Sequence, residues 1–68
     1  MIYAKIKTNK GVRILLKPSN HDGIYEAMME ITGNDHEISA DAASWCELAT
    51  IGEIYEFREG EIEIVDID

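Results

Sequence analysis

The sequence predicts an α+β domain: a mostly antiparallel, four-stranded sheet made of two β-hairpins, with one main helix packed on one face. Three observations predict it. Residues 2–8, 12–17 and 54–58 alternate between two faces with a period of two, as half-buried strands do. Residues 40–51 have the apolar spacing of a helix, and short glycine-containing turns separate the alternating segments. A length of 68 residues predicts one domain, 1–68, near the lower size limit for a core that folds unaided.

Residues 2–8 and 12–17 predict the first hairpin, with a turn at Asn9-Lys10-Gly11. In the first strand, Ile2, Ala4 and Ile6 should face the core. In the second strand, we expect Val12, Ile14 and Leu16 to do so. The outer face of the hairpin would then carry Tyr3, Lys5, Lys7, Arg13, Leu15 and Lys17. We interpret it as a solvated face rather than a basic binding patch, because lysines there discourage edge-to-edge pairing.

Residues 18–23 have the composition of a loop, and residues 24–31 fit two structures. As a helix, the segment places Ile24, Ala27, Met28 and Ile31 on one stripe. As a strand, it alternates Tyr25, Ala27, Met29 and Ile31 with glutamates. The content of Ala, Met and Glu favours a short second helix, which Asp22 could cap.

The main helix is predicted over about 40–51, with Ser39 as its N-cap and Gly52 as the residue that ends it. Ala42, Trp45, Cys46 and Ala49 form its apolar stripe, which Leu48 should widen. The indole of Trp45 is flanked by small residues, so we expect it to fill the gap between the helix and the sheet.

The second hairpin is predicted from residue 54 onward, with a tight turn at Glu59-Gly60. Tyr55 and Phe57 should share one face of its first strand. The period of two fails along residues 61–68, so we expect either a β-bulge near Val65, which would align Ile62, Ile64 and Ile67, or a strand end buried on both sides by a second subunit.

Charge is segregated along the chain, which carries a net charge of −8. Residues 1–17 contain five of the six basic residues and no acid, whereas all 14 acids lie between Asp22 and Asp68, joined only by Arg58. The excess of acid argues against direct binding of nucleic acid. One interpretation is structural: Glu61 and Glu63 of the last strand would lie across from Lys5, Lys7 or Arg13 and help to set the strand register.

No residue pattern predicts catalysis or a cofactor. Cys46 is expected to be buried in mid-helix, away from the N-terminal end that would lower its pKa. His21 and His36 each stand beside an aspartate but lack the spacing of a metal site, so we expect no metal. A single cysteine and the lack of a signal peptide or an apolar span favour a reducing cytoplasm and no membrane partner.

Two classes of function remain. The first is a small acidic, non-enzymatic protein that binds a larger protein with a basic surface, such as a nucleic-acid-binding protein, and inhibits or regulates it. A phage or mobile element is one source for such a protein. Its predicted contact residues are Glu26, Glu30, Asp35, Glu37, Glu47, Glu53, Glu56, Glu59, Glu61 and Glu63. The second class is a structural module that self-associates as a homodimer to complete its core, using apolar residues left over from the core pattern.

Overall fold

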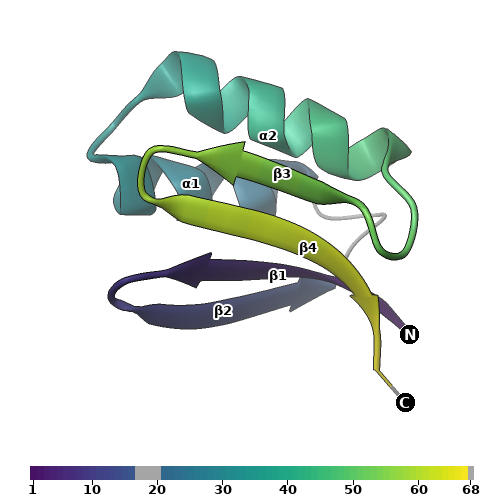
Figure 1. Cartoon of the computed structure of the whole chain (residues 1–68). Coiled ribbons are helices and arrows are strands. Elements are labelled where there is room, and N and C mark those ends of the chain that lie inside the picture. The colour runs from purple at the N-terminus through teal and green to yellow at the C-terminus, as the bar shows by residue number, and fades with distance from the viewer. Residues whose placement is uncertain (17–20, 68) are drawn as a thin grey trace.

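The computed structural model describes residues 1–16 and 21–67. Six elements follow one another as two strands, two helices and two strands (Figure 1). They are β1 (Ile2–Thr8), β2 (Gly11–Leu16), α1 (His21–Thr32), α2 (His36–Leu48), β3 (Ile54–Phe57) and β4 (Gly60–Asp66). The predicted α+β class, with two hairpins in one antiparallel sheet, is confirmed, and the ambiguous segment 24–31 is a helix.

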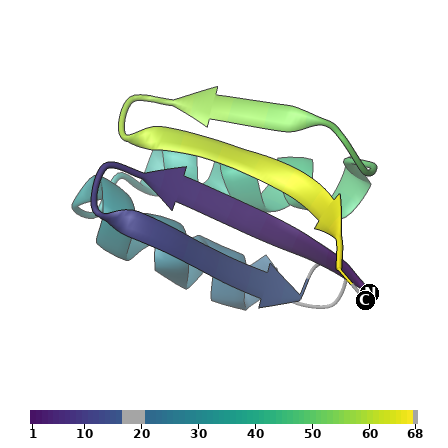
Figure 2. The ribbon, with the colours of Figure 1, turned by 60° about the horizontal axis from the view of Figure 1, so that its bottom comes forward.

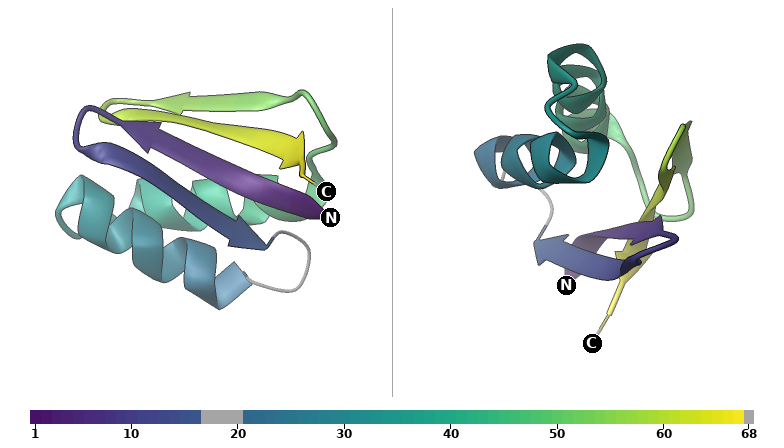
Figure 3. Two further views of the ribbon diagram at one scale, coloured as in Figure 1. Left: turned by 90° about the horizontal axis from the view of Figure 1, so that it is seen from below. Right: turned by 90° about the vertical axis from the view of Figure 1, so that its left-hand side faces the viewer.

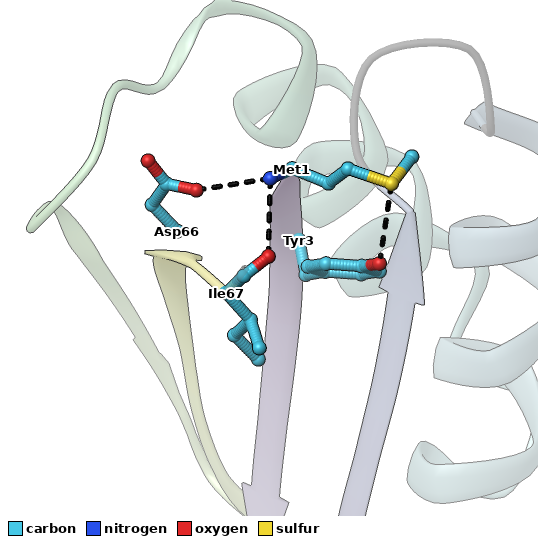
Figure 4. A network of polar contacts seen from close by, with 4 residues as sticks. All are labelled: Met1, Tyr3, Asp66 and Ile67. Carbon is cyan, nitrogen blue, oxygen red and sulfur yellow. Dashed lines mark hydrogen bonds and ion pairs between the residues drawn. The ribbon is translucent and has the colours of Figure 1, made fainter.

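The sheet has the strand order β2-β1-β4-β3, so the first and last strands of the chain pair with each other at its centre. Their register runs without interruption from Ile2 opposite Asp66 to Thr8 opposite Gly60. The two ends of the chain consequently lie side by side (Figure 2). The Met1 ammonium donates to Asp66 Oδ1 and to the Ile67 carbonyl oxygen, each at 3.0 Å (Figure 4). The Ile67 N–H in turn donates to the Met1 carbonyl at 2.9 Å.

Both helices pack on the same face of the sheet and leave the other face uncovered by any described helix (Figure 3). The core lies between these two layers. Its buried apolar side chains come from the two central strands and from the two helices with the C-cap of α2. They are Ala4, Ile6, Ile24, Ala27, Met28, Ala42, Ala43, Cys46, Ala49, Ile62 and Ile64. The edge strands contribute the partly buried Leu15, Tyr55 and Phe57. Because α2 buries only small side chains there, its backbone can approach the sheet closely.

The outer face of β2 differs from the prediction. Val12, Ile14 and Leu16 are exposed, whereas Arg13 and Leu15 are on the helix side, opposite the buried Ile6 and Ala4. The reason is the length of the turn. Thr8 pairs with Gly11, so the connection is the two residues Asn9-Lys10 rather than the three predicted. A change of one residue in a loop shifts the strand by one position and moves every side chain to the other face.

The main helix begins four residues earlier and ends three residues earlier than predicted. Its N-cap is Asp35, whose Oδ1 accepts from the Ile38 N–H at 3.0 Å. Ser39 therefore is not a cap: it is fully buried inside the helix, and its hydroxyl has no hydrogen-bond partner. The helix ends at Leu48 with Ala49 as C-cap, so Gly52 lies in the turn before β3 with φ +95°.

Two smaller expectations are also wrong, and one of the two alternatives for the last strand is excluded. Leu48 does not widen the apolar stripe, because 86% of its surface is exposed. Asp22 lies in the first turn of α1 instead of capping it, since the helix begins at His21. No bulge occurs in β4, where pairing with β1 is regular up to Asp66, and Ile67 is 42% exposed. Residues 17–20, which include Lys17 and part of the predicted loop, lie outside the described residues, as does Asp68.

The predicted charge register is present in the sheet. Lys5 lies directly across from Glu63, and Lys7 from Glu61. Opposite charges at such positions stabilise a sheet by roughly 0.2–1 kcal/mol per pair, and like charges destabilise it by similar amounts.

Reversing both lysines, as Lys5→Glu with Lys7→Glu, is therefore expected to lower the free energy of unfolding by about 1–2 kcal/mol. At this chain length, the melting temperature should fall by roughly 4–8 °C for each kcal/mol, measured by circular dichroism. The control is Lys10→Glu, because Lys10 lies in the hairpin turn, outside the strand register. A double variant that melts at the wild-type temperature would show that charge does not help to fix the register.

Candidate protein-binding surfaces

The exposed surface of the two helices is acidic. Neither helix contains a lysine or an arginine. Each helix carries three exposed acids, which are Asp22, Glu26 and Glu30 on α1, and Glu37, Asp41 and Glu47 on α2. We call these six residues the acidic helix layer. The α1 acids repeat every four residues, so their Cα atoms follow one side of the helix about 6 Å apart.

Several of these acids are placed where they disfavour the helices. Like charges four residues apart repel by a few tenths of a kcal/mol. Glu30 and Glu47 lie in the last turns of their helices, where the helix dipole favours cations, and neither last turn contains a basic residue. Asp22 and Glu37 lie in the first turns of their helices, where the dipole favours acids, so the unfavourable placement applies only to part of this layer.

Only part of this negative charge is neutralised within the described residues. Arg13 Nη1 of β2 lies 2.9 Å from Glu30 Oε2, and both side chains are about half exposed or more. Such exposed ion pairs contribute little to stability. His21 lies 3.6 Å from Asp22 and 4.0 Å from Glu47, which also places the end of α2 beside the start of α1.

The remaining predicted contact residues are divided between structural positions and the opposite face. Asp35 caps α2. Glu53 accepts hydrogen bonds from the backbone N–H and the hydroxyl of Thr50. Glu59 is in the turn between β3 and β4, with one carboxylate oxygen buried and unbonded. These three acids thus belong to turns and caps rather than to one surface.

Glu56, Glu61 and Glu63 belong to the uncovered face of the sheet. They alternate with the core-facing Phe57, Ile62 and Ile64 on the same strands. Glu61 and Glu63 lie beside the lysines of β1, so this face is of mixed charge. The ten predicted acids therefore do not form one continuous patch. Sequence reasoning omitted Asp22 and Asp41, although the lack of any basic residue between positions 18 and 57 pointed to them.

Trp45 does not lie fully inside the core. It is half-buried on α2 and packs against Tyr55 of β3, with ring centroids 5.5 Å apart, and Tyr55 in turn contacts Phe57 at 6.3 Å. Burial raises the pKa of the Tyr55 hydroxyl, and the nearby Asp41 and Asp35 carboxylates raise it further. Tyr55 therefore stays neutral at physiological pH and acts as a packing residue at the edge of the helix layer.

The groups suited to chemistry are placed apart from one another. Cys46 is buried in the core, and His36 Nδ1 is 2.7 Å from the Tyr25 hydroxyl at the helix surface. A cleft of about 630 Å³ lies between the first hairpin turn and α1 and is lined by the Arg13–Glu30 ion pair, Lys10, Ile31 and Glu59. Within residues 1–16 and 21–67, no group of three His, Cys, Asp or Glu side chains could hold a metal ion. No helix among them is long and apolar enough to cross a membrane.

Comparison with known proteins adds no relative to this description. No protein-family model matches the chain, and neither a curated protein nor a solved structure matches it.

Proposed function

We propose that this protein is a small, acidic, non-enzymatic interaction protein that binds a basic surface on a larger protein and inhibits or regulates it. The observation that carries this proposal is the acidic helix layer: six exposed carboxylates on two adjacent helices without one lysine or arginine. A surface of one sign attracts a surface of the opposite sign over about a Debye length and accelerates their encounter.

A nucleic-acid-binding protein is the partner class that this surface fits best. Such proteins carry clusters of lysine and arginine that neutralise phosphates, and carboxylates on a helix present negative charge to the same groups. A protein that occupies this cluster of lysine and arginine would compete with nucleic acid and so inhibit the nucleic-acid-binding protein that carries the cluster. The setting we propose is a reducing cytoplasm, since the sequence has a single cysteine, which is buried in the core.

The test compares two variants that each remove three charges without changing side-chain size. The first replaces Glu26, Glu37 and Glu47 of the helix layer by glutamine, and the second replaces Glu56, Glu61 and Glu63 of the sheet face. Each protein is immobilised, incubated with a cell extract at low salt, and eluted with a salt gradient. Retained proteins are identified, and the nucleic-acid-binding or nuclease activity of each is measured with and without the free wild-type protein.

We expect wild type and the sheet variant to retain a basic nucleic-acid-binding protein, and the helix-layer variant to lose at least tenfold in affinity. Binding should weaken as salt rises, and the free protein should inhibit the activity of what it retains. Retention that is insensitive to salt, or that only the sheet variant loses, would contradict an acidic helix layer as the binding surface.

A further inference from the structure

The uncovered face of the sheet carries a row of four side chains with an unusual symmetry. The strand register aligns Ile14 of β2, Lys5 of β1, Glu63 of β4 and Ile54 of β3 side by side. Their neighbours along β1 and β4, including Ala4 and Ile64, are buried under the helices, so these four side chains point away from the helices. Ile14 and Ile54 are each 50% exposed. The row therefore reads aliphatic, positive, negative, aliphatic across the sheet, whose open face is toward the viewer in Figure 2.

A two-fold axis that runs parallel to the strands, between β1 and β4, reverses this row and places it over itself. Lys5 of one copy then faces Glu63 of the other, and Glu63 faces Lys5. At the edges, Ile14 faces Ile54 in both copies. The row is thus complementary to its own reversed image in charge and in polarity, which is what an isologous interface requires.

The adjacent row follows the same rule at its centre. It consists of Val12, Lys7, Glu61 and Glu56. The same axis places Lys7 over Glu61 of the second copy. Val12 and Glu56 meet at the outer corner, where a polar rim is usual.

Charge also selects among the ways in which two such faces can meet. A two-fold axis in the same plane but perpendicular to the strands would place β1 over β1 and β4 over β4. Lysines would then face lysines and glutamates would face glutamates, which is unfavourable. Only the axis parallel to the strands brings opposite charges together in both rows. We propose that this protein forms a homodimer in which the uncovered faces of two sheets pack against each other about that axis.

The size of the face sets the expected strength of this dimer. Four strands spaced about 4.8 Å apart, each with about six residues rising about 3.3 Å, cover a footprint of roughly 400 Å² per copy. The two copies together give roughly 800 Å², which lies below the range of about 1,200–2,000 Å² for specific, stable interfaces and is typical of weak, transient association. The central charges lose hydration on contact, which offsets part of their attraction. A reversible dimer with a dissociation constant in the micromolar range or above is therefore expected.

The test uses two single variants, Lys5→Glu and Glu63→Lys, studied alone and as an equimolar mixture. Alone, each variant places like charges opposite each other across the two-fold axis. In a heterodimer from the mixture, both central contacts between the two copies in this row again join opposite charges. Sedimentation equilibrium measures association from about 10 μM to about 1 mM, the range in which such a dimer would be half formed.

We expect wild type to dimerise, each variant alone to dimerise at least tenfold more weakly, and the mixture to regain a heterodimer of near wild-type affinity. A wild-type protein that stays monomeric throughout this range overturns the proposal. So does a mixture that associates no better than its separate components.

A second pair of variants keeps the proposal testable if either charge variant does not fold, as judged by circular dichroism. Ile14→Thr and Ile54→Thr keep the β-branched shape on opposite edges of the sheet, and each should weaken the dimer. Leu48→Thr is the matched control, because Leu48 is an exposed aliphatic residue on the helix side. If Ile14→Thr weakens association and Ile54→Thr does not, the copies pair through the edge strand β2 instead, and the face-to-face dimer is wrong. The Glu26, Glu37 and Glu47 variant should dimerise as wild type does, which separates this proposal from the one for the helix layer.

Discussion

Replacing Gly60 with alanine is expected to unfold the protein or to cost it more than about 3 kcal/mol, a large part of the total stability of a domain this small. Gly60 begins β4 and lies opposite Thr8 of β1. A Cβ atom at this position would be 2.9 Å from the Lys7 carbonyl carbon and 3.1 Å from the Thr8 Cα, with the Lys7 carbonyl oxygen nearer still. All three atoms belong to the backbone, so no side-chain rotation can relieve the overlap, and the two central strands would have to separate.

Urea denaturation, followed by the fluorescence of Trp45 and by circular dichroism, measures this effect. The matched control is Gly33→Ala, because Gly33 lies in the turn between the helices with φ +68° and has no atom within 4 Å of its would-be Cβ. Its cost should be about 1 kcal/mol, the penalty for a left-handed conformation with a side chain. If the two alanine variants had the same denaturation midpoint, the close approach of β1 at Gly60 would be refuted.

Truncation of Met28 to alanine is the second change with a large expected effect. The Met28 side chain is fully buried in the core that α1 forms against the sheet. Removal of a buried side chain of this size costs about 2–5 kcal/mol, through lost burial of apolar surface and the cavity that remains. We expect a denaturation midpoint well below that of wild type and a less cooperative transition.

Met29 provides the comparison, since it is the next residue and is only partly buried. Met29→Ala preserves helix propensity and should cost about 1 kcal/mol or less. If the two variants lost equal free energy of unfolding, Met28 would not be more deeply buried than Met29, contrary to the helix. The contrast therefore tests the helix assignment of a segment whose sequence also fits a strand.

The class of fold could be predicted because two independent patterns agreed. The apolar alternation of Ile2, Ala4 and Ile6 identified a core-facing strand, and the opposite charges of β1 and β4 indicated which strands are neighbours. Both signals are local or depend on simple electrostatics, and both describe the structure. The stripe of Ala42, Cys46 and Ala49 on the main helix was equally informative, because small apolar residues at helical spacing have few other uses.

The errors arose where two local solutions of similar energy compete. Asp35 and Ser39 are both good N-caps, and the choice between them depends on where the preceding helix ends. Here, α1 ends through Gly33 and Asn34, which adopt φ values of +68° and +70°, so the chain is ready to begin α2 at once. The hairpin face depended on one residue of turn length, which the sequence Asn9-Lys10-Gly11 does not determine. Val12, Ile14 and Leu16 are apolar but exposed, and a core pattern read from sequence assigns such residues inward.

The candidate surfaces were harder to predict than the fold. The contact residues predicted from the sequence include four of the six residues of the acidic helix layer. They also include acids that cap a helix or lie in turns. Net charge along the sequence carries no information about which side of a sheet or helix a carboxylate occupies. That distribution depends on the register and on the helix bounds, which only the three-dimensional structure fixes.

The pairing of β1 with β4 has a consequence for how the chain reaches its folded state. The β1–β2 hairpin and the helix pair can form from neighbouring residues, but the central seam joins Ile2 to Asp66 and closes only when the last strand is present. Contacts so distant in sequence slow folding, because the entropy of closing the loop is lost before the contacts form. During synthesis, the inner edge of β1 would stay open while the ribosome adds the helices and the second hairpin. The lysines along β1 then disfavour pairing of this unpaired strand edge with other chains.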